Sequence, residues 1–165
     1  MPHLRWKLAA LALASMAPIG QAHAATTTIQ ANAKIVKSLT LSARQNLDFG
    51  TITLSGTPGT FTIAVSQAGT VSCPSGATCA GTARQAILNV QGSNAQNVRI
   101  TVANANLVNT ADGSTIAFTP DAPASVTLTN SGSPGKDFNV GGSIAVPSTA
   151  DGTYSGNVEV TVDYQ

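Results

Sequence analysis

Short runs in which apolar and polar residues alternate fill most of the chain after residue 36. Gly, Pro, Asn and Asp separate these runs at intervals of about ten residues, as in "ADG", "TPDAP" and "NSGSPG". An alternation of period two is typical of half-buried strands, and such punctuation is typical of the turns that join them. The runs cover residues 37–42, 47–54, 60–66, 85–90, 97–102, 114–118, 125–130 and 138–146. The pattern predicts an all-β sandwich or barrel.

The last fifteen residues, "DGTYSGNVEVTVDYQ", carry the most regular alternation in the sequence. It predicts one half-buried strand that continues to the final residue. The positions predicted to face inward are Tyr154, Gly156, Val158, Val160, Val162 and Tyr164.

The first 24 residues have the pattern of a secretory leader. Arg5 and Lys7 precede the apolar run 8–20, and Ala22-His23-Ala24 forms a small-x-small cleavage site. A membrane anchor is the alternative, but the apolar run is short for a bilayer span. We therefore predict a signal peptide over residues 1–24, an N-terminal extension over 25–36 and one β-domain over 37–165.

The extension has its own alternation, with bulky residues at its ends and small ones in its middle. One set of positions is Thr27, Ile29, Ala31, Ala33 and Ile35. Such a strand either pairs within its own chain or adds to a sheet of a neighbouring subunit. The sequence alone leaves both readings open.

Removal of the leader leaves 141 residues without His, Trp or Met, and with six Lys or Arg against seven Asp or Glu. No basic patch remains for nucleic acid, and no histidine remains to serve a Ser- or Cys-based catalytic centre. Asp112 and Asp151 each precede a Gly, where capping of a turn explains them. The "SPGKD" segment at 133–137 lacks the glycine spacing of a phosphate-binding loop. We predict no enzymatic activity, no cofactor and no metal site.

Cys73 and Cys79 have five residues between them in "SCPSGATCA". In an exported protein this spacing favours a disulfide that closes a small loop. A metal site is the alternative, but two thiols without histidine are a poor ligand set for zinc. A redox-active pair is the third reading, although the spacing is not Cys-x-x-Cys.

Three segments, 39–52, 136–147 and 151–165, resemble a bacterial family named only as a domain of unknown function, DUF4402. That family is similar to fimbrial subunits assembled by the chaperone–usher route, whose C-terminal strand has a penultimate Tyr and a Gly fourteen residues from the end. Tyr164 and Gly152 match that pattern.

The resemblance implies an immunoglobulin-like sandwich that lacks one strand. A periplasmic chaperone would first lend that strand, and the extension of the next subunit would then replace it at an outer-membrane usher. The donor side chains would be Thr27, Ile29, Ala31, Ala33 and Ile35. The residues bordering the partner strand would be Gly152, Tyr154, Val158, Val160, Val162 and Tyr164.

The function expected from the sequence is therefore that of a structural subunit of a surface pilus, exported through the periplasm, with a role in adhesion or biofilm. Its partners would be identical or related subunits, the chaperone and the usher, with a host or surface receptor as a further candidate. The alternative is a secreted or tip-located β-sandwich that binds a ligand, like an adhesin or lectin.

Overall fold

The computed structural model describes residues 24–165, so the predicted leader lies outside the described residues apart from Ala24. All regular structure in this range is β-strand, which confirms the all-β prediction. None of the described residues form a helix that could cross a membrane. The chain divides into a segment ending at Lys34 and a compact domain, Ile35–Gln165. Residues 24–39 contain no strand.

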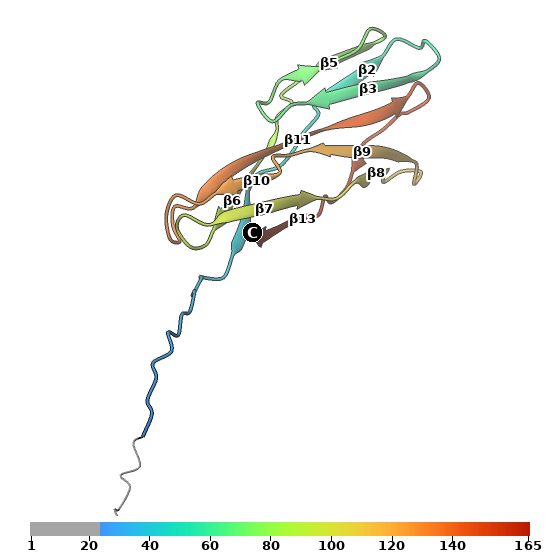
Figure 1. Ribbon diagram of the computed structural model, residues 1–165. Coiled ribbons are helices and arrows are strands. Elements are labelled where there is room, and N and C mark those ends of the chain that lie inside the picture. The colour runs from blue at the N-terminus through green and yellow to red at the C-terminus, as the bar shows by residue number, and fades with distance from the viewer. Residues whose placement is uncertain (1–23) are drawn as a thin grey trace, which may run out of the picture. The chain divides into compact units, whose positions relative to one another are not determined.

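The domain is built from short antiparallel strands joined by tight turns (Figure 1). Their bounds are β1 Thr40–Gln45, β2 Thr51–Leu54, β3 Thr60–Val65, β4 Val71–Ser72, β5 Ala77–Ala80, β6 Ala86–Gln91, β7 Asn97–Val102, β8 Ala105–Asn109, β9 Thr115–Asp121, β10 Ser125–Thr127, β11 Lys136–Pro147, β12 Tyr154–Ser155 and β13 Val160–Tyr164.

Strand β11 is the longest and organises the largest sheet. Its first part pairs with β6, with Phe138 opposite Leu88, and β6 pairs with β1. Its second part pairs with β3 on one edge and β9 on the other, with Ile144 opposite both Ile63 and Phe118. The sheet continues from β9 through β8 to β12 and from β3 to β4. Because β11 changes partners partway along, the sheet curls around the core.

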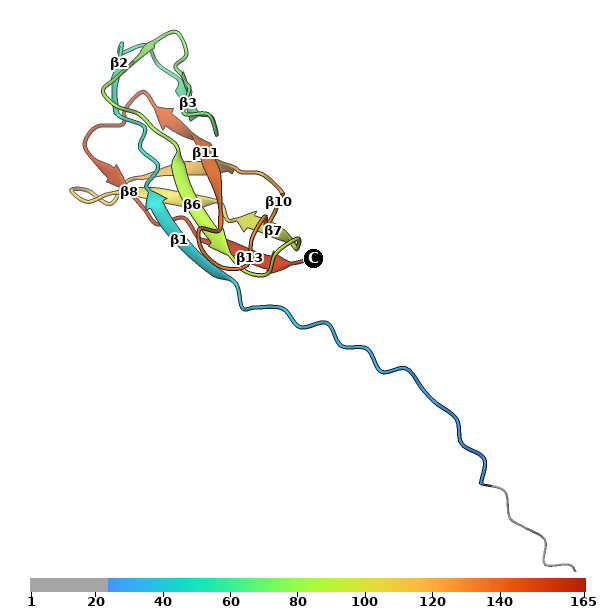
Figure 2. The same ribbon diagram turned by 90° about the vertical axis from the view of Figure 1, so that its left-hand side faces the viewer.

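Two smaller sheets complete the domain. Strand β7 lies between β10 and β13, and strand β2 pairs with β5. Figure 2 shows β1 and β13, which belong to different sheets, on the same side of the domain.

Two apolar clusters form the core, and β11 contributes to both. The first cluster lies between β6, the start of β11 and the β7 sheet, and consists of Leu88, Val90, Val98, Ile100, Leu128, Phe138 and Val140. The second lies under β3, β9 and the end of β11, and consists of Phe61, Ile63, Ile116, Phe118, Ile144 and Val146. Along β3, β7 and β9 every second residue is buried or half-buried, as the alternation of apolar and polar residues predicts.

The prediction of one continuous C-terminal strand is wrong. Tyr154 and Ser155 pair with β8, whereas residues 160–164 pair with β7 in another sheet. The chain crosses between the sheets at Gly156, where a Cβ would lie 2.6 Å from the carbonyl oxygen of Asn106. Alternation along the sequence is preserved across the break, so the pattern could not reveal it.

The sequence pattern also missed β4, β5 and β8. Strand β4 ends just before Cys73, and β5 contains Cys79. For this region the sequence predicts only a small closed loop. Strand β8, "ANLVN", has one large apolar side chain on each face and so gives a weak signal. These strands are specified by their partners rather than by their own composition.

Gly142 allows β9 to lie close to β11. A Cβ at this position would lie 2.6 Å from the Phe118 ring and 2.7 Å from the carbonyl oxygen of Thr119. Both neighbours belong to a packed strand, so neither can move away without disturbing the second core cluster.

We therefore expect Gly142→Ala to lower the free energy of unfolding by about 1–3 kcal/mol, because the added methyl overpacks the core. Denaturant titration would measure the change. Ala145→Ser, on the exposed face of the same strand, is the control and should stay within about 0.5 kcal/mol. Equal effects of the two substitutions would contradict this account of Gly142.

Candidate functional site

The described residues enclose an open groove of about 800 Å³. It runs between an early segment, residues 43–54, and a late one, residues 150–160. The early wall is the end of β1, the following loop and β2, and the late wall is the connection from β11 to β13 with β12 in it. The groove thus lies where the first and last parts of the domain face each other.

The floor of the groove is apolar and comes from both core clusters. Strands β6, β8, β9 and β11 supply it, through Ala86, Leu88, Leu107, Ile116, Phe118, Val140, Ile144 and Val146. Phe49 from the early wall stands edge-on to Phe118, with their ring centroids 6.2 Å apart. The Phe118 ring lies over Gly142, between Val140 and Ile144 on β11. Two aromatic rings therefore line the groove, and Phe118 among them is 1% exposed.

The walls present strand edges that have no partner. Within residues 24–165, β1 pairs with β6 alone, β2 with β5 alone, β12 with β8 alone and β13 with β7 alone. An unpaired edge offers backbone N–H and C=O groups to any further strand that reaches it. An apolar floor between two such edges can take an extended peptide with one apolar face.

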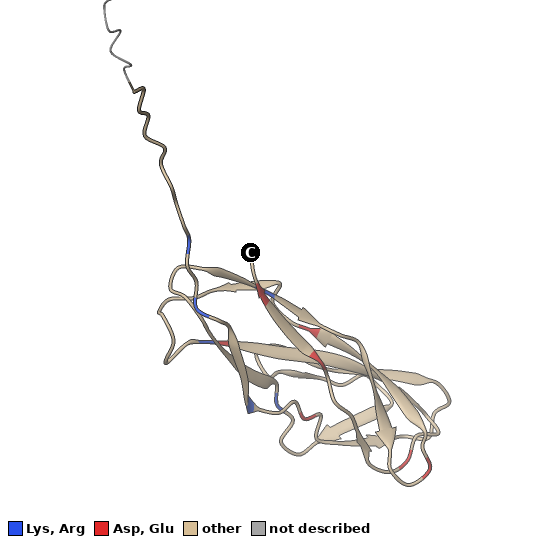
Figure 3. Ribbon diagram, turned by 90° about the horizontal axis from the view of Figure 1, so that it is seen from below, with Lys and Arg blue, Asp and Glu red and all other residues tan. Residues whose placement is uncertain are grey.

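Two carboxylates lie along the groove, one on each wall. Asp48 belongs to the early wall and Asp151 to the late wall. Asp48 accepts a hydrogen bond from the Gly50 N–H at 2.9 Å, and its other oxygen lies 3.9 Å from Arg84 Nη2. Figure 3 shows that the few charged residues of the domain are scattered rather than gathered in one patch. The groove walls therefore favour a cationic over an anionic side chain.

Four of the six predicted partner-strand residues line this groove, namely Gly152, Tyr154, Val158 and Val160. The other two, Val162 and Tyr164, pack against the first core cluster instead. The break between β12 and β13 explains the division, because only residues up to Val160 border the opening. The floor residues were not singled out by the sequence pattern, since a groove floor has the same alternation as any core.

The predicted donor residues, from Thr27 to Ile35, lie in the segment without strands and are exposed. Ile29 is 89% exposed and Ile35 is 92% exposed. A large aliphatic side chain held in water gives up about 1.5–3 kcal/mol of burial free energy. Two such residues on one face of an extended segment form an apolar stripe that remains to be covered.

The predicted disulfide is formed between Cys73 and Cys79, whose Cα atoms are 6.1 Å apart. Cys79 lies opposite Ile52 in the β2–β5 pair, and Cys73 follows β4. The bond therefore connects the β2–β5 pair, whose strand β2 belongs to the early wall of the groove, to the end of β4 in the main sheet.

The two Asp-Gly carboxylates have different surroundings. Asp112 accepts hydrogen bonds from the N–H and hydroxyl of Ser114, at 2.8 and 2.7 Å. These bonds lower the pKa of the Asp112 carboxyl below its ordinary value. Asp112 caps its own turn, whereas Asp151 lies in the groove wall. Among residues 24–165, no three His, Cys, Asp or Glu side chains come together as metal ligands would.

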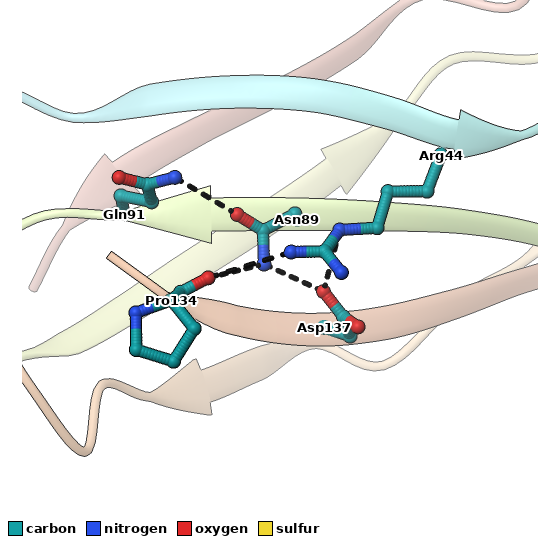
Figure 4. Close-up of polar contacts among 5 residues, drawn as sticks. All are labelled: Arg44, Asn89, Gln91, Pro134 and Asp137. Atoms are coloured by element: carbon teal, nitrogen blue, oxygen red, sulfur yellow. Dashed lines mark hydrogen bonds and ion pairs between the residues drawn. The ribbon is translucent and has the colours of Figure 1, made fainter. Parts of the chain in front are cut away.

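A polar network lies on the β1–β6–β11 sheet (Figure 4). Asn89, only 2% exposed, donates through Nδ2 to Asp137 Oδ1 at 2.6 Å and to the Pro134 carbonyl at 3.0 Å. Gln91 donates to Asn89 Oδ1, and Arg44 Nε lies 3.3 Å from Asp137 Oδ1. The hydrogen-bonding groups of Asn89 are satisfied by the protein, so the network fastens the 130–135 loop to β6.

Asn89→Ala should lower the free energy of unfolding by about 1–3 kcal/mol, because it removes the donor to a loop carbonyl in a half-buried network. Equilibrium denaturation would measure this loss. Ser42→Ala, opposite Asn89 on β1 but outside the network, serves as the control and should be near neutral. A near-neutral Asn89→Ala would show that the network does not hold the loop.

The fold and site define an all-β protein with curled antiparallel sheets. An apolar groove lies between residues 43–54 and residues 150–160. The family described as a domain of unknown function (DUF4402) matches residues 39–164, and the chain belongs to that family. The match begins just before β1 and ends at Tyr164, so it includes both walls of the groove. Neither a curated protein nor a solved structure is significantly similar to the chain.

Proposed function

We propose that this protein is a structural subunit of a surface pilus, built by exchange of donor strands between subunits. In this proposal the domain is an immunoglobulin-like sandwich that lacks one strand, and the groove is the vacant position. A periplasmic chaperone fills the groove after export, and the extension of another subunit replaces the chaperone at an outer-membrane usher. The observation that carries the proposal is the apolar groove between unpaired strand edges, together with an exposed apolar segment in the same chain.

The extension has about as many residues as each wall of the groove. The early wall, 43–54, has twelve residues, the late wall, 150–160, has eleven, and the extension, 25–36, has twelve. A fully extended strand of twelve residues spans about 40 Å. In the proposal the extension lies between the two walls and pairs with their free strand edges.

Side-chain sizes also agree. The extension has Ile29 and Ile35 near its ends and Ala31 and Ala33 between them. The aromatic rings of Phe49 and Phe118 line the groove, and the small side chains of the extension would lie against them. Lys34 belongs to the opposite face of the extension, which would point away from the floor. The apolar face of this segment therefore suits the apolar lining of the groove.

The chain's own extension is too short to fill its own groove. The Lys37 backbone is hydrogen-bonded to the domain, and six residues, about 20 Å, separate it from Ala43, where the groove begins. If the extension turned back on itself, the turn would use at least about two residues. A further six residues would be needed to run back alongside β1 as far as Ala43. Only residues 25–28 would then reach the groove, and they contain no isoleucine. The occupant must therefore come from a second copy.

Binding of the extension is testable with a synthetic peptide of residues 25–36. The recipient is the mature chain with Ile29→Asp and Ile35→Asp, which disable its own extension by placing charges on the apolar stripe. At one hundred times its Kd the peptide should stabilise this recipient by about 2.7 kcal/mol, or on the order of 10 °C in Tm. Differential scanning calorimetry would measure the shift.

The matched control is the same peptide carrying both Asp substitutions, which should leave the Tm unchanged. A Val158→Asp recipient, with a charge in the groove wall, should also fail to respond to the native peptide. If the native and substituted peptides act alike, strand exchange is excluded, and the secreted ligand-binding reading becomes the better one.

A further inference from the structure

Backbone and side-chain groups of three residues meet at the place where the extension joins the domain. The Tyr164 hydroxyl donates to the Lys37 carbonyl oxygen at 2.6 Å and accepts from the Ser93 N–H at 2.8 Å. The Lys37 N–H donates to Ser93 Oγ at 2.7 Å. We name this closed set of contacts the exit clamp. It joins the residues before β1, the turn between β6 and β7, and the end of β13.

The surrounding structure is shaped for the exit clamp. The Tyr164 ring packs against the first core cluster, which fixes the direction of its hydroxyl. A Cβ at Gly92 would collide with that hydroxyl and would lie 2.8 Å from Leu39 Cδ2. Glycine at residue 92 is therefore what lets Tyr164 reach Lys37. The N–H and the carbonyl oxygen of Lys37 are both hydrogen-bonded, which fixes the backbone conformation at this residue.

We propose that the exit clamp keeps the extension out of the chain's own groove and so reserves it for a second copy of the chain. This inference rests on the proposed function. Tyr164 is in this role a positioning residue: it touches the root of the extension and does not line the groove.

The geometry of a released extension explains the need for such a clamp. The free edge of β1 can accept an antiparallel strand, and residues 36–39 could form a four-residue hairpin turn. That hairpin would place Ile35 opposite Thr40 and Ile29 opposite Asn46, which lines the groove. With Lys37 clamped, residues 36–39 cannot form this turn, so the extension is not folded back along β1 from Thr40 onward. Ile29 then stops short of the groove.

The test compares hydrogen exchange of the extension in the mature chain, 25–165, with and without the clamp. In dilute wild-type protein, the amides of residues 29–35 should exchange at unprotected rates. In Tyr164→Phe, which keeps the ring and removes both hydroxyl contacts, they should exchange at least tenfold more slowly. This protection should not change on dilution, because the pairing is within one chain. Ser93→Ala, which removes the acceptor for the Lys37 N–H, should act in the same direction.

Ser131→Ala is the matched control. Its hydroxyl accepts from the Asn94 N–H at 3.0 Å, so its loss removes one contact from the same β6–β7 turn without touching Lys37. It should exchange like wild type. The inference is overturned if the extension of Tyr164→Phe exchanges like wild type, if its protection grows with protein concentration, or if Ser131→Ala has the same effect.

The same measurement separates this inference from the function on which it rests. Concentrated wild-type protein should show protection of residues 29–35 that depends on concentration. If that protection is absent while dilute Tyr164→Phe is protected, strand exchange between copies fails and the clamp stands. If concentrated wild type is protected and dilute Tyr164→Phe is not, the clamp fails and strand exchange stands.

Discussion

Strand β11 is the constraint on which the rest of this domain depends. It supplies Phe138 and Val140 to one core cluster and Ile144 and Val146 to the other. At Gly141 and Gly142 the strand passes from pairing with β6 to pairing with β3 and β9. A Cβ at Gly141 would lie 2.7 Å from the backbone carbon of Ser66, so only glycine permits this close approach. The curl of the sheet follows from that change of partners.

The groove is a consequence of the same arrangement. Strand β11 is hydrogen-bonded along its edges to β3, β6 and β9. Beside the groove, its apolar face is flanked by segments from the first and last parts of the domain. Those segments, 43–54 and 150–160, use their hydrogen bonds on one side only. In our proposal the space between the two walls takes one more strand, which comes from another copy. The assembly of the pilus would then satisfy backbone groups at the strand edges that folding of the domain leaves unpaired.

The fold class could be predicted because alternation of period two survives in the inward residues of nearly every strand, from Phe61 and Ile63 to Val160 and Val162. The disulfide could be predicted from export and from the close spacing of the two cysteines. Strand breaks and sheet membership could not. Tyr154 and Val160 have the same parity in the sequence, yet they belong to different sheets, since a two-residue period does not record which partner accepts the hydrogen bonds.

The sequence by itself determined the alternation that buries one face of most strands, where most of the turns lie, and that a segment with an alternation of its own precedes the domain. These properties depend on local alternation and on the conformations that Gly, Asn and Asp permit. Only the tertiary structure decided that residues 43–54 face residues 150–160 across an open floor, and that Tyr164 reaches Lys37 rather than the groove. Contacts between residues more than a hundred positions apart depend on how the sheets curl and cross, and no short-range pattern in the sequence encodes that.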